Sequence, residues 1–265
     1  MKTFFKIIVP NYNNEQWLGR CLESIFSQTF EDWKLIVIDD CSTDNSRGII
    51  EHFASKDKDR IIPIFSEVKL FNGGARNIGI RTPIKSEYTV FVDSDDCLKD
   101  ENCLKDLHDF IIENKKPDCI RIQYEIEHHG DKNCVVRLDD DTLEKLTHSI
   151  FVACWTKVIK TDSIVPFPEN TLMEDVVQHI RQCDRLKNVV VFNRPEVFYH
   201  HNRNNKNSCS IDSNMDTQNG KWQSSMFRYM ADLLDLECEH SYCEEERIKR
   251  KNACYENIKK GVYWQ

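Results

Sequence analysis

The sequence predicts an α/β protein built around one mostly parallel sheet. Apolar, β-forming segments at residues 4–9, 35–39 and 61–65 alternate with segments in which apolar residues recur every three or four positions. Strands that alternate with helices are joined by right-handed crossovers, so the strands lie parallel in one sheet with helices on its faces. The length of 265 residues is enough for one large domain or two closely fused halves.

The first elements can be justified in order. Residues 4–9 form a strand, and residues 15–28 form an amphipathic helix. The run LIVID at 35–39 is apolar throughout, which indicates a strand buried on both faces. One residue of the segment Ser-Thr-Asp at 42–44 then caps a helix that carries Phe53.

The later elements continue the alternation and then depart from it. They are a strand at 61–65, a helix opened by GGARNIGI (73–80), a strand that ends at Asp93, a helix at about 100–114, a hairpin of 119–127 with 133–139, a helix near 142–153, a helix within 172–187, an extended segment at 188–201, and helices at 216–240 and 244–263. We expect the last two helices to form a C-terminal appendage to the α/β domain.

Two acidic clusters lie at the carboxyl ends of predicted strands. Asp39 and Asp40 end one strand, and FVDSDD (91–96) places three aspartates at the end of another. Ligands of a parallel sheet bind beyond the carboxyl ends of its strands, so the two clusters should face one crevice. Carboxylates this close raise one another's pKa, which calls for a cation from outside the chain. A loop or a helix cap is the alternative interpretation.

Composition excludes several classes of protein. The net charge of −8 argues against binding duplex DNA through a broad basic face. The twelve cysteines include no Cys-x-x-Cys pair, so reduced thiols packed in the core are favoured over a zinc site.

The N-terminal residues MKTFFKIIVP superficially resemble a signal peptide. Lys6 interrupts the apolar run, and no small-residue cleavage site follows it. No later stretch approaches the roughly 20 apolar residues that span a bilayer. The sequence therefore predicts a cytoplasmic protein.

Several short motifs occur in a fixed order: IVPNYNN (8–14), SQTF (27–30), VIDDCSTDNS (37–46), NGGARNIGI (72–80), FVDSDD (91–96), MED (173–175) and YHHNRNNKNSCS (199–210). This ordered set, spanning residues 4–210, resembles the family-2 glycosyltransferases of the GT-A fold, related to bacterial enzymes that build surface polysaccharides. The departures are Cys41, where the family often has glycine, the tandem His200–His201, and a stretched NRNNKNS segment.

The resemblance implies a nucleotide-sugar site in the first half of the chain. Asp40 would accept a hydrogen bond from the nucleotide base, and Tyr12 would lie against the face of that base. Pro10 and Asn13 would shape the same loop. The implied division of the chain is a nucleotide-sugar-binding half at 1–115, an acceptor-binding half at 116–215, and C-terminal helices at 216–265.

The resemblance also implies a divalent cation, Mn²⁺ or Mg²⁺. Asp93 and Asp95 would form the DxD motif, with Asp95 the direct ligand and Asp93 near the ribose or the metal. Of the two tandem histidines, His201 is assigned to the metal or phosphate, and an ordinary packed or surface histidine is the alternative. Arg76 would approach the diphosphate or brace Asp93 and Asp95, and an exposed arginine at a helix start is the alternative.

The second half would supply the catalytic base. The family pattern assigns this role to Asp175, with Glu174 as the fallback, and two helix N-terminal charges are the alternative. A carboxylate in this place can take the proton of the acceptor hydroxyl as the new bond forms. Lys157 would contact the acceptor or a phosphate, and a solvated strand lysine is the alternative.

The function implied is a metal-dependent, inverting transfer of a sugar from a nucleotide-diphosphate donor, a UDP-sugar, to an acceptor hydroxyl. One rival is a nucleotidyltransferase that makes the sugar nucleotide, for which PNYNNEQ lacks the usual basic, glycine-rich loop. The other is a catalytically silent binding module. The sequence leaves open a glycan, a protein, a small molecule or a nucleobase of DNA as acceptor.

Basic residues gather near Tyr263 and Trp264 in the last helix. This composition suits docking on an anionic membrane, which would place the protein peripherally at the inner face. Three consecutive glutamates at 244–246 dilute the charge, and a solvated helix is the alternative.

Overall fold

The structure is a computed structural model, and it describes residues 2–127, 134–136, 153–169, 174–183, 185–192 and 199–202. Within these residues a seven-stranded sheet has the order β10-β6-β9-β4-β1-β2-β3. Its strands are β1 (Thr3–Asn11), β2 (Trp33–Asp40), β3 (Ile61–Ser66), β4 (Ser86–Phe91), β6 (Cys119–Ile122), β9 (Lys157–Lys160) and β10 (Val189–Phe192). Strand β9 runs antiparallel to both neighbours, and the other pairs are parallel. The predicted mostly parallel α/β sheet is confirmed.

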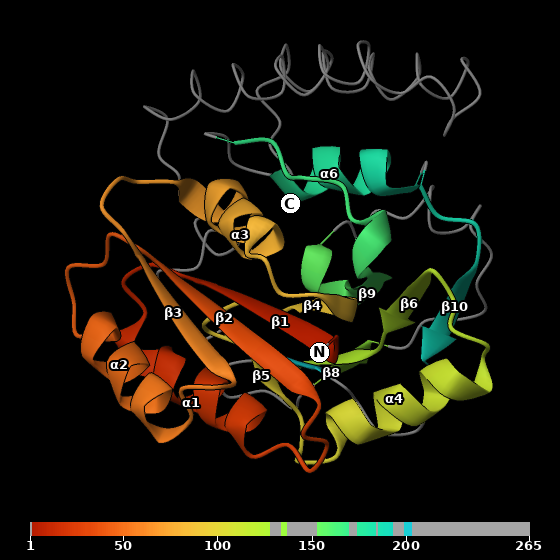
Figure 1. Cartoon of the computed structure of the whole chain (residues 1–265), viewed down its shortest axis with the longest axis horizontal. Coiled ribbons are helices and arrows are strands. Elements are labelled where there is room, and N and C mark those ends of the chain that lie inside the picture. The colour runs from red at the N-terminus through yellow and green to blue at the C-terminus, as the bar shows by residue number, and fades with distance from the viewer. Residues whose placement is uncertain are drawn as a thin grey trace.

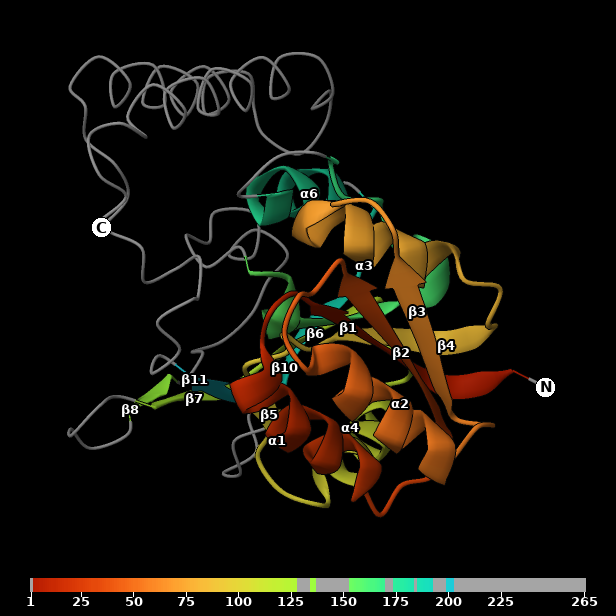
Figure 2. The same cartoon turned by 90° about the vertical axis from the view of Figure 1, so that its left-hand side faces the viewer.

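Helices cover both faces of this sheet (Figures 1 and 2). On one face lie α1 (Glu15–Phe26), α2 (Ser46–Lys56) and α4 (Cys103–Glu113), and on the other lie α3 (Phe71–Arg81) and α6 (Glu174–Cys183). Two short 3₁₀ turns, η1 (Cys154–Thr156) and η2 (Thr161–Ser163), flank β9.

The two covered faces explain why the central strands are largely apolar. Successive side chains of a strand point to opposite faces. Ile7 of β1 packs in the cluster that contains Leu22 of α1, whereas the next residue, Ile8, packs in the cluster that contains Ala75 of α3. Both side chains are fully buried, so β1 is covered on both of its faces.

A second sheet has the order β5-β11-β7-β8 in the described residues. It contains β5 (Cys97–Leu98), β7 (Tyr124–Glu127), β8 (Cys134–Val136) and β11 (Tyr199–Asn202). Strands β7 and β8 pair antiparallel, as the predicted hairpin requires. The single strand expected at 119–127 is wrong, because Gln123 divides it into β6 in the large sheet and β7 in the small one.

The signal-like N-terminal residues form the central strand β1. Lys6 is buried, and its Nζ donates a hydrogen bond to the carbonyl of Ile80 at 3.0 Å. No helix in the described ranges is long and apolar enough to cross a membrane. The helices expected near 142–153 and at 216–240 and 244–263, and with them the membrane-docking segment, lie outside the described residues.

The cysteines that the structure describes with their side chains are free thiols: Cys21, Cys41, Cys97, Cys103, Cys119, Cys154 and Cys183. All of these except Cys41 are buried, which confirms for this part of the chain that the thiols pack as small apolar groups.

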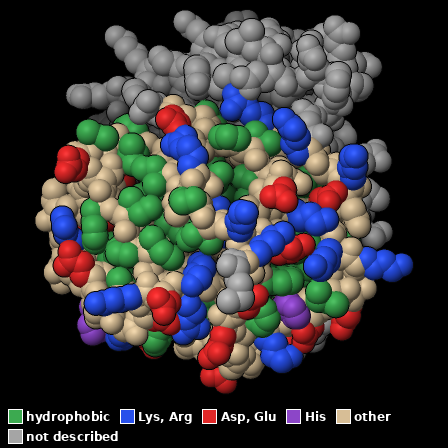
Figure 3. All heavy atoms as spheres, in the orientation of Figure 1, with side chains coloured by type: hydrophobic (Ala, Val, Ile, Leu, Met, Phe, Trp, Pro, Cys, Tyr) green, Lys and Arg blue, Asp and Glu red, His purple; other side chains and the backbone are tan. Residues whose placement is uncertain are grey.

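Acidic and basic side chains are interspersed over the face drawn in Figure 3.

Candidate active site

The loops that follow β1, β2 and β4 meet at one edge of the large sheet, as the sequence predicts. Asn11 at the end of β1 donates its side-chain amide to Asp39 at the end of β2, with an Nδ2–Oδ1 distance of 2.8 Å. Asn14 in the loop after β1 donates to Ser94 in the loop after β4, with an Nδ2–Oγ distance of 2.8 Å. The two acidic clusters therefore share one edge.

Arg76 lies at the centre of the carboxylates. Its Nη2 is 2.7 Å from Oδ1 of Asp93, and its Nη1 is 2.5 Å from Oε1 of Glu174 and 3.5 Å from Oδ1 of Asp175. The residue is 1% exposed and lies in the second turn of α3, so the exposed helix-start alternative is wrong. The contact between Arg76 and Asp93 is the brace that we considered for this arginine. Part of the positive charge that the aspartates require thus comes from the chain itself.

Gly73 allows α3 to approach the segment that leads to α6. A Cβ at Gly73 would lie 2.3 Å from the carbonyl oxygen of Pro168 and 3.3 Å from Cβ of Glu174. Gly73 and Gly74 both lie within α3. The absence of a side chain at Gly73 places Glu174 within reach of Arg76.

Asn77, one residue after Arg76, fixes the same segment by hydrogen bonds. Its Oδ1 accepts the backbone N–H of Phe167 at 2.8 Å, and its Nδ2 donates to the carbonyl of Phe167 at 2.9 Å. From the other side, the side chain of Gln182 in α6 accepts the N–H of Val165 and donates to the carbonyl of Ser163. The segment at 163–167, which precedes Glu174 in the chain, is thus held by α3 and by α6.

Burial dominates the electrostatics of the carboxylates. It raises the pKa of Glu174 to about 8, helped by the negative charge of Asp175 and opposed by Arg76. Burial also raises the pKa of Asp93, where Arg76 opposes the shift and the charges of Asp96 and Asp175 add to it. The raised pKa favours the protonated form of Glu174.

The two acidic residues at the start of α6 differ in access to solvent. The side chain of Asp175 is 23% exposed and that of Glu174 is 5% exposed. Asp175 can thus meet a molecule that enters from solvent, whereas Glu174 faces the buried guanidinium. The general-base assignment to Asp175 stays a prediction.

Asp40 holds the residues that begin α3. Its two carboxylate oxygens accept the backbone N–H groups of Leu70 at 2.6 Å and Phe71 at 2.9 Å. Phe71 has a φ of 58°, a left-handed conformation that a bulky residue adopts only when its surroundings impose it. The contact between Asp40 and a nucleotide base stays a prediction.

Lys69 joins this segment to the first loop. Its Nζ lies 2.9 Å from Oδ2 of Asp40 and 2.9 Å from the centre of the Tyr12 ring. Tyr12 is 47% exposed, so one aromatic face carries the ammonium group while part of the ring meets solvent. Tyr12 is therefore available at the edge where the predicted nucleotide would bind.

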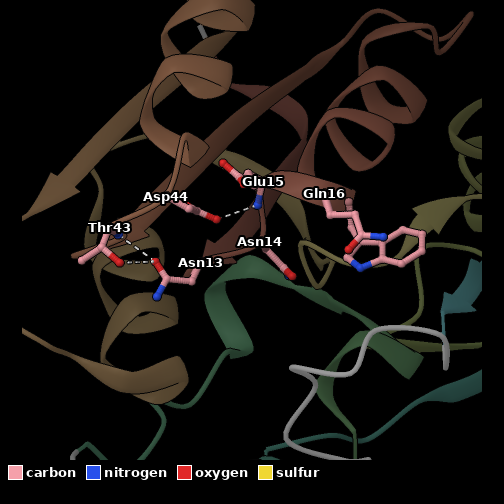
Figure 4. Close-up of a pocket in the computed structure, with 7 residues that line it drawn as sticks. Asn13, Asn14, Glu15, Gln16, Thr43 and Asp44 are labelled. Carbon is pink, nitrogen blue, oxygen red and sulfur yellow. Dashed lines mark hydrogen bonds between the residues drawn. The ribbon is translucent and has the colours of Figure 1, made fainter.

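The loop after β1 borders an open hollow of about 310 Å³ lined by Asn13, Asn14, Glu15, Gln16, Trp17, Thr43 and Asp44 (Figure 4). Asn13 has a φ of 48°, and its Oδ1 accepts the backbone N–H of Thr43 at 2.7 Å. Pro10 lies in β1 and is paired with Ile38 of β2. The structure thus places Tyr12 and Asn13 in the loop after β1, whereas Pro10 lies in the strand that leads to this loop.

The predicted metal ligands are only partly described. Asp93 and Asp95 are half-buried in the turn after β4, and the backbone of His201 lies in β11 beside Ile126. Among the residues that the structure describes, no group of three or more His, Cys, Asp or Glu side chains is arranged to hold a metal. The metal assignments of Asp93, Asp95 and His201 stay predictions.

Two further residues have environments that the sequence did not reveal. Lys157 is buried, and its Nζ donates to the carbonyl of Ala153 at 3.0 Å, so the solvated alternative is wrong. Tyr199 contacts the Asp93–Asp96 turn through its hydroxyl. More than 100 positions separate these partners, and no local pattern carries a signal for such a contact.

A family model described as Glycosyl transferase family 2 matches residues 6–150, more than half of the chain. The chain belongs to glycosyl transferase family 2. This family-2 chain is 38% identical over 108 residues to the glycosyltransferase GlyG of Streptococcus pneumoniae, covering 41% of the chain and 35% of GlyG. It is 35% identical over 115 residues to the poly(ribitol-phosphate) β-N-acetylglucosaminyltransferase TarS of Staphylococcus aureus, covering 42% of the chain and 19% of TarS. The matched segments thus span less than half of these relatives.

Solved structures extend the similarity to nearly the whole family-2 chain. Residues 1–349 of TarS in complex with UDP-GlcNAc superpose with a TM-score of 0.72 at 21% identity, covering 98% of this chain and 72% of that one. The mannosyltransferase PcManGT of Pyrobaculum calidifontis, in complex with GDP-Man and Mn²⁺, gives a TM-score of 0.58 at 12% identity, covering 97% and 70%. At these identities the likeness concerns the fold, and it confirms the predicted GT-A fold.

Proposed function

We propose that the chain transfers a sugar, with inversion, from a nucleotide-diphosphate donor to an acceptor hydroxyl. The observation that carries this proposal is the bridge made by Arg76 between Asp93, beyond β4, and the acidic residues that begin α6. It brings the predicted diphosphate side and the predicted base side of the reaction to one buried guanidinium. The donor we propose is a UDP-sugar, because TarS, which has this fold, was solved with UDP-GlcNAc.

The donor would lie beyond the carboxyl ends of β1, β2 and β4. Tyr12 would stack on the nucleobase after Lys69 leaves that face of its ring. Nε of Arg76 is buried and has no hydrogen-bond partner among the described residues. An N–H in this position is a donor for an anionic oxygen, which a diphosphate supplies.

The carboxylates around Arg76 fit a divalent cation that is shared with the donor. Asp93, Asp95, Asp96 and Asp175 outnumber one guanidinium, and hard cations such as Mg²⁺ prefer oxygen ligands. Such cations are held by one or two carboxylates together with substrate phosphates, so a closed protein site is not required. Asp95, with Asp93 and His201, would hold Mn²⁺ or Mg²⁺, which neutralises the charge of the departing diphosphate.

Asp175 would take the proton from the acceptor hydroxyl. Inversion requires this hydroxyl to attack from the side opposite to the diphosphate, so the base has to be accessible from solvent. Asp175 satisfies this condition better than Glu174, whose raised pKa favours its neutral form. The carboxyl group of Glu174 then orients Arg76 and keeps a second negative charge away from the base.

The test is a panel of nucleotide sugars, scored for hydrolysis and for thermal stabilisation with Mn²⁺. We expect one UDP-sugar to be hydrolysed, and UDP at about 100 times its dissociation constant to add ~2.7 kcal/mol to the free energy of unfolding. Absence of both effects for every nucleotide would contradict the proposal, and stabilisation without turnover would indicate a silent binding module.

Two variants separate the metal from the base. Asp95→Ala should remove the Mn²⁺-dependent part of the UDP stabilisation, so equal stabilisation with Mn²⁺ and with EDTA in the wild type would exclude the metal role. Asp175→Asn should lower transfer by about 10²–10⁴-fold while UDP still binds, because the donor side is unchanged. Full transfer by Asp175→Asn together with loss of transfer in Glu174→Gln would move the base to Glu174.

A further inference from the structure

We propose that Tyr199 is a positioning residue that fixes the Asp93–Asp96 turn in the conformation that presents its carboxylates to the donor. This inference rests on the proposed function, and it assigns to β11 a role in the donor site that is separate from that of the histidines after Tyr199.

The hydroxyl of Tyr199 contacts both ends of the turn. It accepts a hydrogen bond from the backbone N–H of Asp93 at 3.0 Å and donates one to Oδ2 of Asp96 at 2.7 Å. Within the turn, the N–H of Asp96 donates to the carbonyl of Asp93 at 3.0 Å. One phenol thus uses its donor and an acceptor position to close the turn.

The contact is fully buried. Tyr199 is 0% exposed and Asp96 is 1% exposed, so the contact is shielded from bulk water. Loss of the hydroxyl would leave the N–H of Asp93 and the carboxylate of Asp96 without this partner in the interior, a situation that buried polar groups relieve by moving. Of the two residues between them, Ser94 and Asp95, the proposed metal ligand Asp95 moves with the turn.

The ring of Tyr199 is held independently of its hydroxyl. It stacks on Trp155 with ring centres 4.7 Å apart and an angle of 6° between the planes, and Trp155 meets Tyr124 edge-on at 4.8 Å. The backbone of Tyr199 pairs with Leu98 in β5 and with Tyr124 in β7. The phenol is therefore aimed by the small sheet and does not depend on the turn that it contacts.

The turn is also the point where the chain leaves one sheet for the other. Strand β4 of the large sheet ends at Phe91, and β5 of the small sheet begins at Cys97. From the large-sheet side, Arg76 holds Asp93; from the small-sheet side, Tyr199 holds Asp93 and Asp96. The position of the carboxylates thus depends on both sheets, and reacting groups misplaced by about 1 Å can lose 10²-fold in rate.

The experiment compares Tyr199→Phe with Tyr88→Phe in the full chain. Tyr88 is a matched control, because it is also 0% exposed and its hydroxyl donates to the carbonyl of Pro117 at 2.8 Å instead of to the turn. Each variant is measured for thermal unfolding without ligand, for UDP affinity with Mn²⁺ and with EDTA, and for kcat and KM of donor hydrolysis.

We expect Tyr199→Phe to weaken UDP binding about tenfold with Mn²⁺, to leave binding in EDTA unchanged, and to lower kcat roughly 10- to 100-fold. Tyr88→Phe should leave kcat, and the ratio of the UDP affinities with Mn²⁺ and with EDTA, at the wild-type values even if its melting temperature falls. The proposal is overturned if Tyr199→Phe keeps the wild-type ratio of affinities and the wild-type kcat, or if both variants change these quantities equally.

A second variant covers the case in which Tyr199→Phe does not fold. Asp96→Asn removes the charged acceptor but not the phenol, and it should reduce the same Mn²⁺-dependent ratio; an unchanged ratio overturns the proposal. A wild-type chain that does not bind UDP at all would instead refute the proposed function, and with it the premise of this inference.

Discussion

Replacing Arg76 by methionine removes a buried cation that contacts several carboxylates. The guanidinium contacts Asp93, Glu174 and Asp175 and is 1% exposed, and methionine keeps most of the apolar stem. Removal of one partner from a buried ion pair typically costs about 3–5 kcal/mol, since the other charge stays buried without compensation. For a domain of this size each kcal/mol corresponds to about 2–4 °C, so the melting temperature should fall by roughly 6–20 °C.

The loss should grow with pH. Arg76 lowers the pKa values of Glu174 and Asp93, which burial raises, so these values rise further in Arg76→Met. The folded variant then binds more protons than its unfolded chain above about pH 4.5, and its stability falls as pH rises. Because the wild type keeps the Glu174 proton up to about pH 8, the two proteins diverge mainly above that pH, and urea unfolding at about pH 7 and about pH 9 measures this difference.

Arg81→Met provides a control on the same helix. Arg81 is exposed and pairs with Glu169 at 3.1 Å, so its loss should cost no more than about 1 kcal/mol at either pH. An equal loss in the two variants, or a loss in Arg76→Met that does not depend on pH, would refute the reasoning.

Two further predictions concern the start of α6 and the glycine of α3 that packs beside it. Glu174→Gln should flatten the dependence of the unfolding free energy on pH. The folded pKa of Glu174 is about 8 and the ordinary value is 4.5, so between these pH values the wild-type fold keeps a proton that the unfolded chain has released, and the fold loses stability as pH rises; glutamine does not titrate. Parallel curves of unfolding free energy against pH for the two proteins would show that Glu174 is ionised in the fold. Gly73→Ala should lower the free energy of unfolding by about 1–3 kcal/mol and reduce transfer, because the new Cβ would lie 2.3 Å from the carbonyl oxygen of Pro168. Gly19→Ala is the control: its Cβ would have no neighbour within 4 Å, so it should stabilise α1 by about 1 kcal/mol. Equal melting temperatures for the two alanine variants would contradict this.

The elements of the first half could be predicted because their signals are local. The apolar run at 35–39 is buried on both faces, and the spacing of apolar residues fixes α1 to within two residues of the structure. The position of Asp39 and Asp93 at one edge of the sheet could be predicted because the carboxyl ends of parallel strands lie at the same edge, and this rule requires only the order of strands and helices.

The corrections arise where one residue depends on distant partners. Arg76 looks like a surface residue by its position near a helix start, and it is buried because α3, whose Gly73 allows a close approach to Pro168, packs against distant segments. Likewise, no period in residues 119–127 marks the change of sheet, because Ile120, Ile122, Tyr124 and Ile126 continue one alternation through β6 and β7. Tertiary pairing with β9 and β11 decides it.

The single residue between β6 and β7 has a consequence for insertions and deletions. Gln123 is all that separates Ile122 in the large sheet from Tyr124 in the small one. One residue added or removed here would turn each side chain of β7 to the opposite face, while β6 kept its place. Tyr124 would then leave Trp155, the ring on which Tyr199 stacks. We therefore expect natural variants of this chain to tolerate changes of length poorly at this junction. A surface loop or a turn between two strands would absorb the same change.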